Sequence, residues 1–144
     1  MKIRTLHESD WEPALALVWE TFLLFEAPDY SPEGVETFQT FIGDRQNFRA
    51  LNLYGVFDGD RLCGVAATRK DGGHLSLLFV REEFQGHGIG RMLIDRVQKD
   101  APGSLTVHSS PYAVEFYRQM GFQDTDVEQL DDGIRFTPMK WTKK

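Results

Sequence analysis

The stretch HLSLLFVREEFQGHGIGRML, residues 74–93, decides the fold of this chain. It opens with a nearly continuous apolar run, which predicts a central strand over residues 74–80 with both faces covered. A turn follows in which Gly86, Gly88 and Gly90 stand at alternate positions, and glycine lets a ligand approach the bare backbone. From Ile89 onward, apolar residues recur at helical spacing, so the turn lies at a helix N-terminus. Unpaired N–H groups and the helix dipole favour a phosphate or pyrophosphate at that point.

The spacing of the glycines excludes two other phosphate-binding loops. A dinucleotide fingerprint needs glycine at its sixth position, but counting from Gly86 that position holds Arg91, and no acidic ribose ligand follows a second strand. A nucleoside triphosphate loop needs a Gly-Lys-Ser/Thr sequence, which the chain lacks. For these six residues taken alone, a turn that only changes the direction of the chain remains the alternative.

Length and composition predict one domain that spans residues 1–144. Hydrophobic residues make up 41% and charged residues 26%, as in an ordinary globular protein. The formal net charge of −6, without a basic run, argues against a nucleic-acid partner and is compatible with a cationic amine substrate. Cys63 is the only cysteine, so no internal disulfide is expected. No apolar run is long enough to span a membrane and a signal-peptide core is lacking, so we expect a cytoplasmic protein without a membrane partner.

Two helices are predicted near the N-terminus, after a short first strand over residues 3–6. Ser9 and Glu12 form a capping-box pattern, and apolar residues then lie on one helical stripe that ends before Pro28. Ser31 followed by Pro32 marks the start of the second helix. Its buried side is expected to consist of Val35, Phe38, Phe41 and Ile42.

An antiparallel meander is predicted to follow the two helices. Strands over residues 51–57 and 62–69 flank Asp58-Gly59-Asp60, and an Asp-Gly pair in this position favours a hairpin. A second turn at residues 71–73 leads into the central strand. These three strands therefore run alternately up and down in one sheet.

A βαβ unit completes the predicted core. A helix over about residues 88–100, a break at Pro102-Gly103 and a strand over residues 105–108 bring the last strand in parallel beside the central one. Ligands of such sheets bind outside the carboxyl ends of the parallel strands. We therefore expect a cofactor between Val80 and His108.

A second motif follows this strand and points to a known superfamily. The pattern Phe116-Tyr117-x-x-Met120-Gly121-Phe122 ends a predicted helix that begins near Pro111, and Gly121 suits a left-handed helix end. Together with Gln85-x-x-Gly88-x-Gly90, it resembles the two acetyl-coenzyme A motifs of the GCN5-related N-acetyltransferases (GNAT). The resemblance covers residues 74–122 and implies a mixed α/β sheet of the acyl-CoA N-acyltransferase fold. The tail over residues 132–139 resembles the last strand of a bacterial subgroup, and residues 122–130 are expected to form an antiparallel hairpin with it.

The resemblance implies transfer of an acetyl group from acetyl-CoA to a primary amine by direct attack in a ternary complex. It implies that Tyr117 gives a proton to the departing thiolate, since a phenol with an ordinary pKa of about 10 is protonated at neutral pH. Without the glycine turn, this tyrosine would be interpreted as a packing residue. The backbone of Val80 is assigned to the thioester carbonyl. The residues expected to bind the cofactor are Phe79, Val80, Gln85, Gly86, His87, Gly88, Ile89, Gly90, Arg91, Ser110 and Tyr117.

Two of these assignments carry alternatives. A solvated surface position is an equal interpretation for His87. Ser110 stands where the family often has asparagine, and a serine can cap the following helix as well as contact the cofactor.

The general base and the acceptor stay open. Candidates for the base on the two N-terminal helices and the loop between them are Glu20, Glu26, Asp29 and Glu33. Candidates on the sheet are Ser76 and His108. Solvated carboxylates and a hydrogen-bonded structural histidine are the alternatives to each. The acceptor is expected to be a small-molecule amine or a peptide amine. The apolar residues of the second helix and of the tail are explained equally well by a homodimer and by packing in the core.

No metal site is expected, because the four histidines are scattered without the paired spacing of zinc ligands. Two other functions use the same scaffold: a regulatory module that binds acyl-CoA without turnover, and an enzyme with another acyl donor or acceptor. Tyr117 argues against the regulatory module, because binding alone needs no acid at the sulfur.

Overall fold

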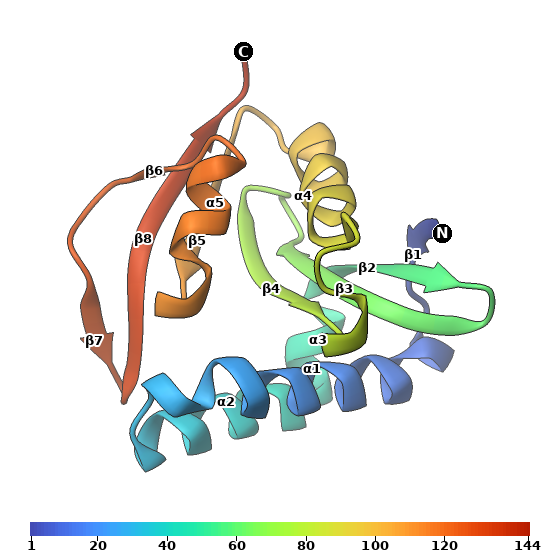
Figure 1. Cartoon of the computed structure of the whole chain (residues 1–144), viewed down its shortest axis with the longest axis horizontal. Helices are drawn as coiled ribbons and strands as arrows, with labels where there is room; N and C mark the ends of the chain where they lie inside the picture. Colours follow the sequence, from blue (N-terminus) through green and yellow to red (C-terminus); the bar gives the residue numbers. More distant parts are fainter.

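The computed structural model describes all 144 residues, which form one mixed sheet with helices on both faces (Figure 1). The strand order is β1-β2-β3-β4-β5-β8-β6, and β7 pairs with β8 at one end. The strands are β1 (Lys2–Thr5), β2 (Leu51–Asp58), β3 (Arg61–Arg69), β4 (His74–Val80), β5 (Ser104–Ser109), β6 (Gln123–Asp124), β7 (Gln129–Asp131) and β8 (Ile134–Thr142). The α-helices are α1 (Trp11–Phe25), α2 (Pro32–Gly43), α3 (Arg45–Arg49), α4 (Ile89–Asp100) and α5 (Val114–Gln119). The meander, the βαβ unit and the C-terminal hairpin predicted from the sequence are all present.

Strand β4 occupies the predicted central position, between β3 and β5. It pairs antiparallel with β3 from Gly64↔Val80 to Thr68↔Leu75. Its coverage is less complete than the apolar run predicts, because buried residues alternate with half-buried ones along the strand. The half-buried side chains, which include Ser76 and Leu78, line a cavity and do not pack under a second layer over their full length.

The strands β4 and β5 pair in parallel only at their first residues and then diverge (Figure 1). The parallel register contains His74↔Thr106 and Leu75↔Val107, and no pair beyond them. β5 instead pairs with β8 over its whole length, from Ser104↔Thr142 to Ser109↔Thr137. The carboxyl-terminal halves of two parallel strands are therefore left apart, which is the place where α/β sheets bind ligands.

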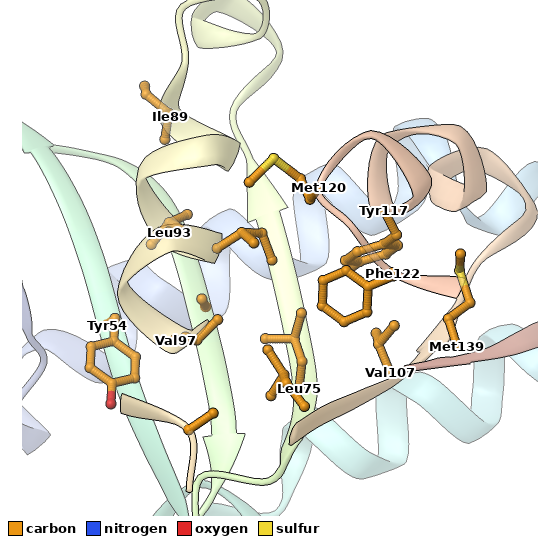
Figure 2. Close-up of a cluster of buried hydrophobic side chains, with 14 of the residues drawn as sticks. Tyr54, Leu75, Ile89, Leu93, Val97, Val107, Tyr117, Met120, Phe122 and Met139 are labelled. Atoms are coloured by element: carbon orange, nitrogen blue, oxygen red, sulfur yellow. The ribbon is translucent and has the colours of Figure 1, made fainter. Parts of the chain in front are cut away.

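Helices α4 and α5 cover one face of the sheet (Figure 2). The amphipathic pattern predicted for α4 is confirmed, since Ile89, Leu93, Ile94 and Val97 form its buried face. Tyr117, from α5, joins the same cluster. Burial of each large apolar side chain stabilises the fold by roughly 1.5–3 kcal/mol.

Helices α1, α2 and α3 cover the opposite face. Phe22 of α1 is fully buried and stacks on Phe38 of α2 with ring centroids 4.1 Å apart. Phe38 in turn lies 5.8 Å from the ring of Phe79 on β4. This chain of aromatic rings fixes both helices against the strand from which the site is built. None of the helices combines the length and apolar character that a membrane span requires.

The start of α1 differs from the prediction. Ser9 was expected to cap the helix, but it lies inside a 3-10 turn, η1 (Glu8–Asp10), that precedes α1. Asp10 satisfies the backbone there instead, because its carboxylate accepts the His7 N–H at 2.8 Å and also pairs with Arg4.

The C-terminal hairpin and the turn after α2 also differ from the prediction. The strand expected over residues 122–130 is interrupted, so that only β6 and β7 pair with β8. Asp126 causes the break, since its carboxylate accepts the N–H of Val127 at 2.8 Å and a bond from Gln129. The short helix α3 was not predicted; Asp44 begins it by accepting the N–H of Gln46.

Candidate active site

Two cavities meet in the opening between β4 and β5. The first, of about 520 Å³, is lined by the glycine turn and is called the glycine-turn cavity here. The second, of about 360 Å³, lies against α2 and the β7–β8 hairpin and is called the hairpin cavity. Both are lined by Glu26, Leu78, Phe79 and Ala113. Two molecules, one in each cavity, would therefore come together beside these four residues.

The glycine turn presents free amides to the first cavity. Gly88 is the N-cap of α4 with φ +81°, and the first bond of the helix runs from the N–H of Met92 to the carbonyl of Gly88. The N–H groups of Ile89, Gly90 and Arg91 thus have no partner inside the helix. A side chain placed on Gly86 or Gly88 would meet no atom within 4 Å, so the backbone borders open space there. Free amides, a helix dipole and the guanidinium of Arg91 suit a pyrophosphate.

The backbone of Val80 faces the gap between the strands. The N–H of Arg81 donates to the carbonyl of Cys63, which makes Gly64↔Val80 a pair whose own polar groups point away from β3. The carbonyl of Val80 accepts a bond from the side chain of Gln85 at 3.1 Å. The N–H of Val80 is directed to the side from which β5 has diverged, whereas the sequence interpretation expected both the N–H and the carbonyl to be free.

Gln85 and two aromatic rings close the outer side of the glycine-turn cavity. The hydroxyl of Tyr112 donates to the side-chain carbonyl of Gln85 at 3.0 Å. The ring of Tyr112 stacks on Phe25 at the end of α1, with centroids 5.1 Å apart. Sequence reasoning missed both rings, because a stack between α1 and the turn after β5 leaves no local signal.

Glu26 follows the last residue of α1 and is partly buried where the cavities meet. Burial, with a smaller contribution from the nearby charge of Asp29, raises the pKa of its carboxyl to about 7. The hydroxyls of Ser110 and Tyr30 act in the opposite direction, since they favour the charged carboxylate. A carboxyl with such a pKa can accept and release a proton near neutral pH.

Tyr117 is 5% exposed and lines the hairpin cavity beside Glu26. Burial, with a smaller contribution from the charge of Glu26, raises the pKa of its phenol above the ordinary value of 10. The hydroxyl is therefore protonated at neutral pH. The hydroxyl of Ser110, which lines the same cavity, is buried and forms no hydrogen bond of regular geometry. An unpartnered buried hydroxyl in a cleft is suited to bind a ligand.

The remaining predicted residues divide into those inside the cavities and those outside. Ser76 and His108 line the hairpin cavity. Glu20 is exposed on α1 and pairs with Arg81 at 3.2 Å, and it lines neither cavity. Asp29, which is half-buried and pairs with Arg135 at 4.0 Å, also lines neither cavity. Two exposed residues, Glu33 and His87, lie outside both cavities as well.

The wall of the hairpin cavity is closed by a contact between α2 and the β7–β8 turn, which sequence reasoning missed. The hydroxyl of Thr37 donates to the carbonyl of Asp132 at 2.9 Å. Gly34 packs so closely on Gly133 that a side-chain carbon on Gly34 would clash with the Gly133 carbonyl oxygen. The Asp-Asp-Gly sequence could have indicated the turn, but not its contact with a helix far away in the sequence.

This contact gives a testable prediction for Gly34→Ala. The methyl group cannot fit, so α2 and the turn must separate, which we expect to destabilise the fold by about 1–3 kcal/mol. Binding in the hairpin cavity should weaken several-fold, whereas binding in the glycine-turn cavity should not change. Thermal unfolding and separate KM values for the two substrates measure both effects.

Gly43→Ala is the matched control, because a side-chain carbon on Gly43, in the same helix, would meet nothing within 4 Å. This variant should keep the stability and both KM values of the native chain. Equal behaviour of the two variants would show that the contact does not support the cavity.

Comparison with known proteins adds to this geometry. A family model described as an acetyltransferase (GNAT) domain matches residues 26–143. The peptidyl-lysine N-acetyltransferase YjaB of Salmonella typhimurium is 38% identical over 109 residues, which cover 68% of this chain and 75% of the relative. A GCN5-related N-acetyltransferase from Rhodopseudomonas palustris has a TM-score of 0.85 at 24% identity, over 99% of this chain and 95% of that one. The PaiA N-acetyltransferase of Thermoplasma acidophilum, crystallised with coenzyme A, has a TM-score of 0.74 at 19% identity, over 99% and 98% of the two chains.

Proposed function

From the premise that this chain belongs to the GNAT acetyltransferase family and is an N-acetyltransferase, we propose how its two cavities divide the reaction. Acetyl-CoA binds in the glycine-turn cavity, and a primary amine binds in the hairpin cavity. The observation that carries this proposal is that the cavities share Glu26, Leu78, Phe79 and Ala113. Direct attack needs both substrates in one continuous space, and this junction offers it.

The residues of the glycine-turn cavity fit coenzyme A. The amides of Ile89, Gly90 and Arg91 would hold the pyrophosphate, and the N–H of Val80 is available to the thioester carbonyl. The thioester would supply the acetyl group, and coenzyme A would leave as the free thiol. The unpartnered hydroxyl of Ser110 is available to either substrate at the junction of the cavities.

Glu26 and Tyr117 have the protonation states that the chemistry needs. A primary amine with a pKa of about 10.4 arrives as an ammonium ion and must lose a proton before it attacks. Glu26, whose pKa is about 7, accepts that proton directly or through water. Tyr117, whose raised pKa keeps it protonated, donates a proton to the sulfur as the C–S bond breaks. The second proton that the nitrogen loses as the amide forms then restores the phenol of Tyr117.

The acceptor we propose is a lysine side chain on a polypeptide. The relative YjaB is named for this activity. Tyr30, Phe38 and Phe41 give the hairpin cavity an aromatic wall, against which the four methylenes of lysine can pack while the amine reaches Glu26. Asp131 and Asp132 at the rim of the cavity are exposed, so a side chain of a larger substrate can enter there.

An assay of thiol release tests this proposal. The chain is mixed with acetyl-CoA and, in turn, with a lysine peptide, the same peptide with lysine replaced by norleucine, spermidine or a free amino acid. Of the two peptides, we expect only the lysine peptide to cause release of coenzyme A. Mass spectrometry should then detect acetylation of its lysine side chain. Binding of acetyl-CoA without amine-dependent release would instead favour a regulatory module. Faster release from propionyl-CoA would assign another acyl donor.

A further inference from the structure

The charged side chains that line the hairpin cavity are all acidic. They are Glu26, Asp131 and Asp132, and the lining contains neither lysine nor arginine. Asp131 and Asp132 are exposed at the tip of the hairpin, and neither forms an ion pair within the chain. Two carboxylates at the cavity rim are thus free for a ligand, in addition to the one at the junction.

His74 also lines the cavity, and its Nδ1 lies 2.7 Å from the hydroxyl of Thr106. Because burial lowers the pKa of this imidazole to about 4, it adds no positive charge at neutral pH.

The acidic turn is held in place by backbone contacts and not by its carboxylates. Thr37 binds the carbonyl of Asp132, and Gly34 packs on Gly133. Asp132 has φ +50°, a conformation that aspartate and asparagine tolerate better than other side chains. A second sign of a ligand in this cavity is the hydroxyl of Ser110, which is only 6% exposed and forms no hydrogen bond of regular geometry.

We propose that Asp131 and Asp132 bind a second cationic group of the acceptor, so that the preferred substrate is a lysine with another lysine or arginine close by in the same peptide. This inference rests on the proposed acetylation of lysine and specifies its substrate class. Glu26 serves the reacting amine, whereas the rim carboxylates bind the group that does not react. A neighbouring acidic residue in the peptide would be repelled by all three carboxylates.

Peptides that differ in one charge test this inference. A set carries one lysine and a single arginine at each of the three positions on either side, and a parallel set has glutamine in place of that arginine. We expect the native chain to use at least one arginine peptide with a kcat/KM roughly five times that of its glutamine partner at low salt, as exposed ion pairs are weak. The preference should fall in 0.5 M NaCl, because salt screens exposed charges.

The double variant Asp131→Asn, Asp132→Asn should lose the preference, so that its kcat/KM is the same for each arginine peptide and its glutamine partner. Its matched control is Asp58→Asn, Asp60→Asn, which removes the same charge from the exposed β2–β3 turn and should keep the preference. Equal use of both peptide sets by the native chain, or a preference that survives in the double variant, would overturn the inference. Acetylation of no peptide at all would overturn the proposed function and this inference with it.

A small-molecule arm separates the source of the second charge. Cadaverine and pentylamine have the same chain length and differ by one ammonium group. If the double variant lowers the preference for cadaverine over pentylamine and leaves the preference for arginine peptides unchanged, the rim binds a free polyamine. In that case the proposal of a peptide substrate is wrong.

Discussion

Replacing Glu26 with glutamine is expected to lower kcat for amine acetylation by about two to three orders of magnitude, since an amide cannot accept the proton of the ammonium. In the native chain, log(kcat/KM) should rise with pH and level off above about 7, the pKa to which burial raises this carboxyl. The variant should lose that inflection. Steady-state rates between pH 5.5 and 9, with acetyl-CoA saturating, measure both effects. A variant with native turnover would move the role of base to His108 or Ser76, which line the same cavity.

The stability of this variant gives an independent control. The pKa of Glu26 is higher in the folded chain than the ordinary value of 4.5, so the fold disfavours ionisation. Stability linked to this group is complete below about pH 4.5 and is lost as the pH rises through about 7. Glutamine never ionises, so Glu26→Gln should melt at a higher temperature than the native chain at pH 8 and close to it at pH 5. Low activity together with a higher melting temperature would separate catalysis from folding.

Replacing Tyr117 with phenylalanine is expected to lower kcat by about two orders of magnitude or more, with little change in the KM for acetyl-CoA. The ring remains in the cluster shown in Figure 2, but the proton for the departing thiolate is lost. An acyl donor with a more acidic thiol needs that proton less, so the variant should lose less activity with it. Thiol release from the two donors gives the comparison.

Tyr54→Phe is the control for this experiment. Tyr54 belongs to the same buried cluster, but its hydroxyl donates to Asp100, which ends α4 at the opposite end from the glycine turn. Tyr54→Phe also removes one hydroxyl from the cluster, and it should leave turnover unchanged. Native turnover in Tyr117→Phe would remove the proposed acid, and a loss of turnover in both variants would point to a general effect of core packing.

The glycine-turn cavity could be predicted from the sequence because its parts lie close together in the chain. Residues 74–93 contain the strand, the turn and the first helical residues, and each follows from local rules of backbone conformation. The free amides at Gly88 and the orientation of Val80 required only that strand and helix form where the pattern placed them.

The hairpin cavity could be predicted only in part, because it depends on contacts between distant segments. The sequence offered four carboxylates near the end of α1 as candidates for the base, and no local rule chooses Glu26 among them. The choice follows from how α1 crosses the diverging strands, which buries Glu26 and leaves Glu20 paired with Arg81 on the surface. The contact of the β7–β8 turn with α2 likewise depends on packing that neither segment encodes alone.

That contact sets the order in which the two halves of the site can form during synthesis. Every residue of the glycine-turn cavity lies at or before Phe116, whereas the hairpin cavity needs residues up to Phe136. Thr37 and Asp132, which close its wall, are separated by 95 positions. A nascent chain therefore has no complete place for an acceptor until β8 has left the ribosome and paired with β5. The residues of the glycine-turn cavity are synthesised first, so the acceptor cavity is the part of the site that is completed later.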